Sequence, residues 1–178
     1  MDAQTAAAAE RHPMRVGILT ISDRSARGER PDVSGPALVD MAQSAGWQVD
    51  VQVIIPDEMP TIVEVLTNWV DVGKLDLILT TGGTGFAPRD ITPEATLAVV
   101  DRLAPGLAEA MRQESLKITP HAMLSRATAG IRKRTLIVNL PGSPKAAVEN
   151  LKVLLPVLPH AVDLLREDPA AEGGHHKI

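Results

Sequence analysis

The sequence predicts an α/β fold in which a mostly parallel β-sheet carries helices on both faces. A unit made of an apolar run, a Gly- and Pro-rich loop and a helix start appears three times, within residues 16–46, 75–100 and 135–154. Strands that alternate with helices in this way are typical of parallel sheets. The composition agrees, because 44% of the 178 residues are hydrophobic and a chain of this length can fill one core.

The first unit predicts a strand over residues 16–22, followed by a helix that starts near residue 35. Ser34 stands where a helix cap is expected. Pro36 suits the first helical turn, because proline lacks the N–H that a helix start leaves unpaired. Gly46 is a typical stop signal at the end of such a helix.

The next segments predict a second strand and helix, and then the second unit. Residues 48–55 alternate between polar and apolar at their start, which indicates a strand near an edge of the sheet. Residues 61–71 predict a helix. The second unit predicts a strand over residues 75–79, a glycine loop, and a helix with Thr92 as its cap and Pro93 in its first turn.

The C-terminal half combines regular and irregular segments. Residues 103–117 predict a helix that opens near Pro105, whereas residues 118–134 show no clear periodicity. The third unit predicts a strand over residues 135–140 and a helix in which apolar residues recur at core spacing over residues 146–154.

The composition argues against several classes of function. The net charge of -4 and the three aromatic residues argue against nucleic-acid binding through bulk charge or base stacking. The absence of cysteine rules out disulfides and thiolate chemistry. No apolar run approaches the roughly 18 residues of a membrane span, and the N-terminus does not resemble a signal peptide. We therefore expect a cytoplasmic protein without nucleic-acid or membrane partners, folded over residues 14–167 with flexible ends at residues 1–13 and 168–178.

The loops that follow the predicted strands are expected to meet at one edge of the sheet. Right-handed crossovers place Ser22, Asp23, Asp57 and the segments 80–90 and 139–145 at the carboxyl ends of strands. Because ligands of open α/β sheets bind at this edge, the sequence predicts one site built from several loops.

Three glycines, Gly82, Gly83 and Gly85, lie where a strand ends and a helix begins. Backbone N–H groups can converge on a phosphate at such a point. The loop is not a P-loop, because no Gly-Lys-Ser/Thr ends it. It is not a dinucleotide fingerprint either, because Pro88 follows where a third glycine is required. Phosphate binding and a plain tight turn are both compatible with these residues.

Several polar residues near these loops allow both a functional and a structural interpretation. Asp57 and Asp90 each follow a strand, as turn residues do. They also suit Mg²⁺, which takes few carboxylates and completes its shell with water and phosphate oxygens. Lys145 lies in the first turn of a helix, where a cation opposes the helix dipole, so either solvent or a bound anion would compensate it. Ser125 and Arg126 lie in an irregular stretch, where such a pair is also compatible with a plain turn.

Residues 80–96, with the sequence Thr-Thr-Gly-Gly-Thr-Gly-Phe-Ala-Pro-Arg-Asp-Ile-Thr-Pro-Glu-Ala-Thr, closely resemble the molybdopterin adenylyltransferase family of molybdenum cofactor biosynthesis. This family includes bacterial Mog-type enzymes and the G domains of gephyrin and its plant counterpart. Further matching segments occur in the same order at residues 21–23, 32–36, 56–58, 111–120, 123–126 and 139–144. The resemblance covers about residues 14–165 and implies a three-layer α/β/α domain that assembles as a trimer.

The resemblance implies transfer of AMP from ATP to the terminal phosphate of molybdopterin, with release of pyrophosphate and a requirement for Mg²⁺. By motif match, Asp57 and Asp90 take the two aspartate positions that serve catalysis and metal binding. The expected substrate-binding residues are Ser22, Asp23, Ser34, Gly35, Thr81, Gly82, Gly83, Thr84, Gly85, Arg89, Ser125, Asn139, Pro141, Gly142, Ser143 and Lys145. Mg²⁺, the cationic side chains of Arg89 and Lys145, and backbone N–H groups would neutralise the phosphates during transfer.

A second hypothesis is a non-catalytic carrier of molybdopterin, because the related MoaB-type proteins share the fold and the glycine loop. Some of those proteins lack an intact aspartate pair, whereas this chain has both Asp57 and Asp90, which favours the enzyme. The expected partners are molybdopterin and ATP, further copies of the chain in a homotrimer, and a downstream molybdenum insertase.

Overall fold

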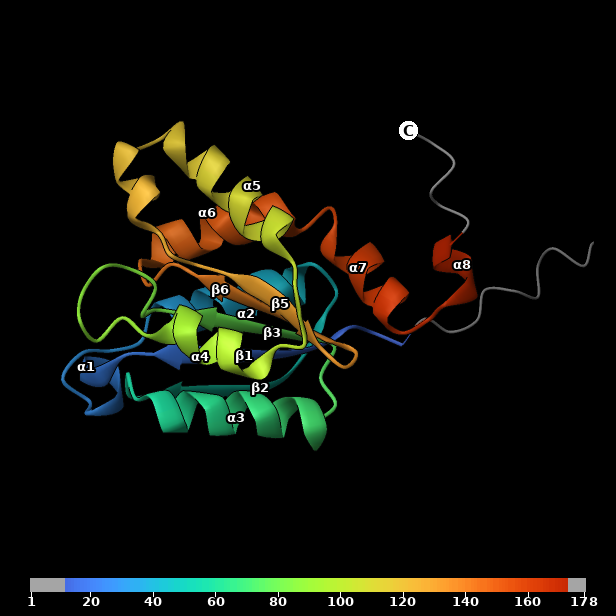
Figure 1. The fold of residues 1–178 in the computed structure, drawn as a ribbon, viewed down its shortest axis with the longest axis horizontal. Coiled ribbons are helices and arrows are strands. Elements are labelled where there is room, and N and C mark those ends of the chain that lie inside the picture. The colour runs from blue at the N-terminus through green and yellow to red at the C-terminus, as the bar shows by residue number, and fades with distance from the viewer. Residues whose placement is uncertain (1–11, 173–178) are drawn as a thin grey trace, which may run out of the picture.

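The structure is a computed structural model that describes residues 12–172, and these residues form a six-stranded sheet with helices on both faces (Figure 1). The strands are β1 (Arg15–Ile21), β2 (Gln48–Ile55), β3 (Leu77–Thr81), β4 (Arg102–Leu103), β5 (Ala129–Arg132) and β6 (Thr135–Leu140). The helices are α1 (Asp23–Ala26), α2 (Ser34–Ser44), α3 (Met59–Asp71), α4 (Thr92–Val99), α5 (Pro105–Leu116), the 3-10 helix η1 (Pro120–Leu124), α6 (Pro144–Leu154), α7 (Leu158–Leu165) and α8 (Pro169–Glu172).

The sheet has the strand order β2-β1-β3-β6-β5-β4 and is mostly parallel. Strands β2, β1, β3 and β6 run parallel, and β5 and β4 extend this sheet with antiparallel pairing. Every residue of β3 and β6 is buried, as expected for central strands covered on both faces. Strand β2 alternates in exposure and lies at one edge. The predicted α/β fold with a mostly parallel sheet is therefore confirmed.

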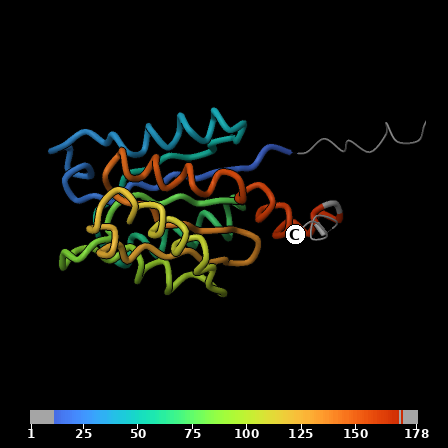
Figure 2. Tube along the Cα trace, turned by 90° about the horizontal axis from the view of Figure 1, so that it is seen from above, coloured from blue at the N-terminus to red at the C-terminus, as the bar shows by residue number. Residues whose placement is uncertain are grey.

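Two hydrophobic cores hold the three layers together. Alternate residues of the strands enter opposite cores, so Leu77 and Leu79 of β3 face one core while Ile78 faces the other. Helices α2, α5, α6 and α7 cover the first face, and α3 and α4 cover the second. Seen from above, α6 lies between α2 and α5, which it contacts (Figure 2). This packing leaves the carboxyl ends of the parallel strands to the loops.

Helices α2 and α4 begin differently from the sequence prediction. Their N-cap positions are Val33 and Ile91, so the prediction that Ser34 and Thr92 act as caps is wrong. The Ser34 hydroxyl instead donates a hydrogen bond of 2.8 Å to the carbonyl of Gly142, and the Thr92 hydroxyl donates one of 2.9 Å to a carbonyl of the glycine loop. Both hydroxyls bind distant loops because tertiary partners lie within reach once the chain is folded.

The ends of the chain are described in part. Residues 1–11 and 173–178, which belong to the ends we expected to be flexible, lie outside the described residues. The described part of the predicted tail contains the short helix α8. No helix within residues 12–172 is long and apolar enough to cross a membrane.

An ion-pair cluster at the end of α3 should give the fold a measurable acid sensitivity. Hydrogen bonds from Arg132, which have the largest effect, and from Lys133 lower the pKa of Asp71 to about 2. Because the pKa of Asp71 is lower in the folded state than in the unfolded state, the charged carboxylate stabilises the folded protein at pH values above its ordinary pKa. This stabilisation is lost as the pH falls through about 2. We expect Asp71→Asn to melt at a lower temperature than wild type at pH 6, with a gap that narrows as the pH is lowered from 4 toward 2. A gap that stays constant over this range would contradict the prediction.

Candidate active site

The loops at the carboxyl ends of β1, β2, β3 and β6 surround a cavity of about 750 Å³. Ten of the predicted site residues line it: Ser22, Asp23, Ser34, Asp57, Thr81, Gly82, Gly83, Asp90, Gly142 and Ser143. Residues far apart in the sequence meet here because parallel strands end at the same edge of the sheet. The structure therefore brings most of the predicted residues together in one place.

The glycine loop has a backbone that only glycine adopts easily. Gly82 and Gly83 have φ angles of +101° and +64°, in the left-handed region that side chains disfavour. A Cβ atom on Gly82 would lie 2.2 Å from the carbonyl oxygen of Ile21, and one on Gly83 would lie 2.4 Å from the hydroxyl oxygen of Thr92. These two positions are thus fixed both by backbone conformation and by close approach to β1 and α4.

Asp57 and Asp23 hold the loops after β2 and β1 together. The backbone N–H of Asp23 donates to the Asp57 carboxylate at 2.8 Å, and the N–H of Asp57 donates to the Asp23 carboxylate at 3.1 Å. Arg89 donates two further hydrogen bonds to the Asp23 carboxylate, at 2.5 and 2.9 Å. These bonds from Arg89 are the main reason that the pKa of Asp23 is lowered.

The pKa of Asp57, in contrast, is raised above its ordinary value. Burial is the largest cause, and the negative charges of Asp23 and Asp90 add to it. The N–H of Asp23 and the positive charge of Arg89 offset these effects only in part. The environment of Asp57 would therefore favour a bound cation.

Asp90 closes the far end of the glycine loop. Its carboxylate accepts a hydrogen bond of 2.9 Å from the backbone N–H of Ala87, and a Cβ atom on Gly85 would lie 2.9 Å from that carboxylate. Asp57 and Asp90 come from the loops after β2 and β3 and line the same cavity. Their carboxylates are thus placed to act on one ligand.

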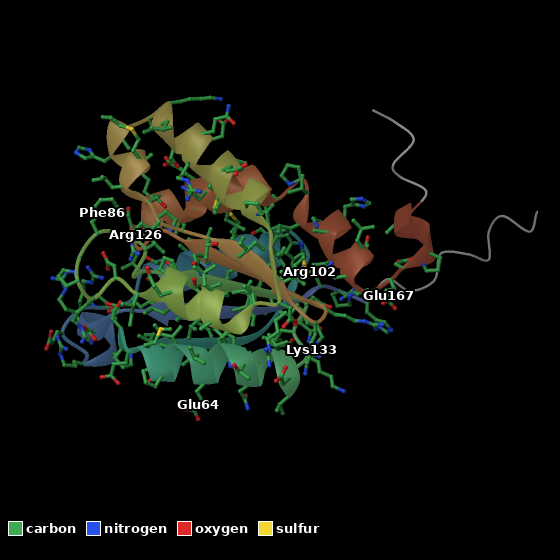
Figure 3. The ribbon with its side chains drawn as sticks, in the orientation of Figure 1. Glu64, Phe86, Arg102, Arg126, Lys133 and Glu167 are labelled. Atoms are coloured by element: carbon green, nitrogen blue, oxygen red, sulfur yellow. The ribbon has the colours of Figure 1, made fainter. Side chains whose placement is uncertain are left out.

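Arg126 is a structural residue of the site whose role the sequence left open. Its guanidinium donates to the carbonyl oxygen of Gly85 at 2.7 Å, donates to the carbonyl of Asp90, and pairs with the carboxylate of Glu94. Its backbone N–H also donates to the carbonyl of Thr84, at 2.9 Å. Figure 3 shows Arg126 beside the loop that carries Phe86, at the opposite end of the molecule from Glu167. A basic residue close to the glycine loop in space, but remote from it in sequence, leaves no local signal.

A second, smaller cavity of about 290 Å³ adjoins the same loops. Its lining includes four predicted site residues, which are Thr84, Gly85, Ser125 and Pro141. Apolar side chains of Ala122, Leu124 and Ala146 also line it. Residues 82–83 and 142 line the larger cavity, and residues 84–85 and 141 line the smaller one. The two cavities are therefore separated by the backbone of these two loops.

Four predicted site residues line neither cavity: Gly35, Arg89, Asn139 and Lys145. Asn139 is fully buried. Its amide nitrogen donates to the hydroxyls of Thr80 and Thr96 at 3.0 and 2.8 Å, and its amide oxygen accepts from the backbone N–H of Thr128 at 3.3 Å. These hydrogen bonds join β6 to β3 and α4.

The remaining three residues have different surroundings. The Lys145 side chain is 80% exposed, and its ammonium lies 3.9 Å from a carboxylate oxygen of Glu149. Gly35 is buried at the start of α2, where a Cβ atom would lie 2.3 Å from the Asp32 carboxylate. Arg89 is held by Asp23. Gly35 is therefore packed behind the lining of the site, Arg89 is an exposed residue that anchors Asp23, and Lys145 faces solvent.

Comparisons with known proteins were consistent with this architecture. A family described as "Probable molybdopterin binding domain" matches residues 17–160. Gephyrin of Dictyostelium discoideum is 49% identical over 164 residues, which cover 86% of this chain but only 23% of gephyrin. A molybdopterin adenylyltransferase of Helicobacter pylori (strain J99) is 43% identical over 155 residues, covering 85% of this chain and 88% of that protein. The crystal structure of the molybdopterin biosynthesis enzyme MoaB from Thermus thermophilus has a TM-score of 0.83 and 54% identity, covering 88% of this chain and 98% of that chain.

Proposed function

This chain belongs to the molybdopterin-binding-domain family, and from that membership we propose that it is a molybdopterin adenylyltransferase. It transfers AMP from ATP to the terminal phosphate of molybdopterin and releases pyrophosphate, as a step of molybdenum cofactor biosynthesis. The observation that carries the proposal is the meeting of Asp57 and Asp90 with the left-handed glycines of the loop in one cavity. The molybdopterin adenylyltransferase of Helicobacter pylori, which this chain matches over 88% of its length, also supports the proposal.

The residues present fit a magnesium ion that arrives with ATP. Among residues 12–172, no three His, Asp or Glu side chains are placed to hold a metal by themselves. Mg²⁺ needs only one or two carboxylates when substrate phosphates and water complete its shell. Asp57 and Asp90 would supply those carboxylates, and the raised pKa of Asp57 reflects an environment that a cation would relieve. When bound, the ion would neutralise phosphate charge and polarise a phosphoryl oxygen.

The chain itself has mainly to position two substrates. A terminal phosphate is already ionised near neutral pH, so its oxygen can attack the α-phosphorus of ATP without a strong base. The bond from that phosphorus to the bridging oxygen then breaks, and pyrophosphate leaves. Because the two cavities share the walls formed by residues 82–85 and 141–142, we place ATP in the larger, charged cavity and the pterin in the smaller, more apolar one. This arrangement would hold the reacting groups at the shared wall, where correct orientation supplies much of the rate.

The proposal is tested by measuring pyrophosphate release from the purified protein. We expect release when molybdopterin, ATP and Mg²⁺ are all present, and none when any one is omitted. Release from ATP without molybdopterin would indicate a hydrolase, and no release with all three would contradict the proposed reaction.

Ser125 tests the assignment of the smaller cavity. If its hydroxyl donates to a charged phosphate group, Ser125→Ala should lose about 1.5–3 kcal/mol of binding, which corresponds to roughly 10–100-fold in kcat/KM. The fold should survive, because the described contact of this hydroxyl is a 3.4 Å hydrogen bond from the N–H of Ala127. Steady-state kinetics and a thermal melt measure both, with Ser44→Ala on the exposed end of α2 as the matched control. Unchanged kcat and KM would return Ser125 to a purely structural role.

We further expect the protein to be a homotrimer with one active site per subunit, acting in the cytoplasm and passing its product to a molybdenum insertase. Exposed apolar side chains occur at the end of α5, between α5 and η1, and in η1, and they include Leu116, Ile118 and Met123. They are compatible with a surface that another subunit covers. Light scattering at micromolar concentration should give three times the mass of one chain. The mass of a single chain would contradict the trimer.

A further inference from the structure

The segment that follows β1 brings three arginines to the larger cavity. Arg24, Arg27 and Arg30 all line it, together with the aspartates described above. The segment is fixed by its own hydrogen bonds, because the backbone N–H of Glu29 donates to the carbonyl of Arg24 at 2.9 Å and Ser22 caps the short helix α1. The arginines therefore project from an ordered arm at the site.

Only one of these three arginines is paired within the described residues. Arg27 forms a two-pronged ion pair with Glu29, at 2.6 and 3.1 Å. Arg24 and Arg30 are exposed and form no ion pair with any residue between 12 and 172. Arg89, the other cation nearby, is already held by Asp23. Two guanidinium groups are thus available to an anion in the cavity.

The charges of the proposed substrates call for such groups. Asp57 and Asp90 can hold a cation but cannot bind phosphate directly, because like charges repel. A triphosphate bound to one Mg²⁺ keeps uncompensated negative charge on its outer phosphates, and more charge develops on the leaving group as its bond breaks. The planar guanidinium group of arginine matches phosphate geometry with two parallel hydrogen bonds.

We propose that Arg24 and Arg30 bind the β- and γ-phosphates of ATP and hold the departing pyrophosphate. This inference rests on the proposed adenylyl transfer and adds to it the residues that recognise the leaving group. The oxygen that bridges the α- and β-phosphates takes the electron pair of the broken bond, and the two arginines stabilise the charge that results. The residues act on the phosphates that leave, so AMP and molybdopterin make no contact with them.

The test compares Arg24→Gln, Arg30→Gln and the double variant with wild type. We expect each single variant to raise the inhibition constant of pyrophosphate and the KM for ATP by about tenfold, and the double variant to raise both further. The KM for molybdopterin and the affinity for AMP should not change. Arg24→Lys should recover part of the pyrophosphate affinity, because it restores the charge but not the forked geometry.

Two controls separate this role from a general effect of charge or folding. Arg27→Gln removes the same charge from the same arm, but from an arginine that Glu29 already holds, and it should change pyrophosphate inhibition much less. Arg102 is exposed in β4 (Figure 3), and Arg102→Gln should behave as wild type. Thermal melts should be unchanged in all variants, because these side chains are exposed.

Pyrophosphate binding is also measured directly by calorimetry, with Mg²⁺ and without molybdopterin. This measurement distinguishes failure of the assignment of Arg24 and Arg30 from failure of the proposed transfer reaction. If wild type transfers AMP and the Gln variants bind pyrophosphate as tightly as wild type does, the assignment of Arg24 and Arg30 is overturned while the transfer reaction stands. If wild type neither transfers AMP nor binds pyrophosphate, the proposed function itself fails. Equal losses for AMP, molybdopterin and pyrophosphate would also overturn the assignment, because they would indicate a structural effect.

Discussion

Asp57→Asn and Asp90→Asn are each expected to lower the rate of AMP transfer by at least about 100-fold, because metal-assisted charge stabilisation contributes several kcal/mol. Asparagine keeps the shape and one carbonyl oxygen of aspartate but loses the charge that Mg²⁺ requires. The two residues come from different strand ends and line the same cavity, so loss of either should disable the same metal site. Pyrophosphate release measures this effect.

The same two variants should remain folded. Burial and neighbouring carboxylates raise the pKa of Asp57, which means that its charged form is disfavoured in the folded protein, so Asp57→Asn should melt no lower than wild type. Molybdopterin should still bind to both, because its contacts are expected mainly in the glycine loop. Asp40→Asn on the exposed face of α2 is the matched control. Near-wild-type transfer would disprove the metal assignment, and loss of pterin binding would mean that these residues shape the pocket instead.

Gly82→Ala should impair both stability and activity. The left-handed backbone at this position costs a side-chain-bearing residue about 1–2 kcal/mol, and relieving the contact with the Ile21 carbonyl should cost about 1–3 kcal/mol more. The melting temperature should therefore fall by roughly 4–20 °C. Gly82 is held on both sides, since its N–H donates to Leu140 and its carbonyl accepts from Thr92. A shift of the loop should also misplace the reacting groups and slow transfer by about 100-fold.

Two other glycines separate the causes of that loss. Gly28 has a φ angle of +71° with open space around it, so Gly28→Ala isolates the cost of the backbone conformation. Gly106 lies in α5 with neither a positive φ nor a close neighbour, and Gly106→Ala should be neutral or stabilise slightly. Thermal melts should rank the variants Gly106→Ala, Gly28→Ala and Gly82→Ala from most to least stable. Equal stability of the last two would show that the approach to Ile21 is unimportant.

Much of the fold followed from local sequence patterns. Strands β1, β3 and β6 were predicted because each is a nearly continuous apolar run before a Gly- or Pro-rich loop, and all three occur within two residues of the predicted bounds. The position of β2 at an edge was also predicted, since its alternation requires one exposed face. Elements with a strong period and clear end signals thus needed no tertiary information.

The features that were missed depend on contacts between remote segments. Ser34 reads locally as a helix cap, but its partner Gly142 is 108 residues away. Strands β4 and β5 have two and four residues, which is too short to show a period. Arg126 reveals its role only when the loop after β3 folds against it. The hydrogen bonds of Asn139, near the end of β6, likewise go to the hydroxyls of Thr80 and Thr96, which lie 59 and 43 residues away.

The most direct test of the proposed function is mass spectrometry of the pterin after incubation of the protein with molybdopterin, ATP and Mg²⁺. We predict that adenylyl-molybdopterin accumulates in equal amount with pyrophosphate, that it is absent without Mg²⁺, and that Asp57→Asn forms it at least about 100-fold more slowly. Recovery of unchanged molybdopterin bound to the protein, with ATP intact, would contradict adenylyl transfer and would identify the chain as a carrier.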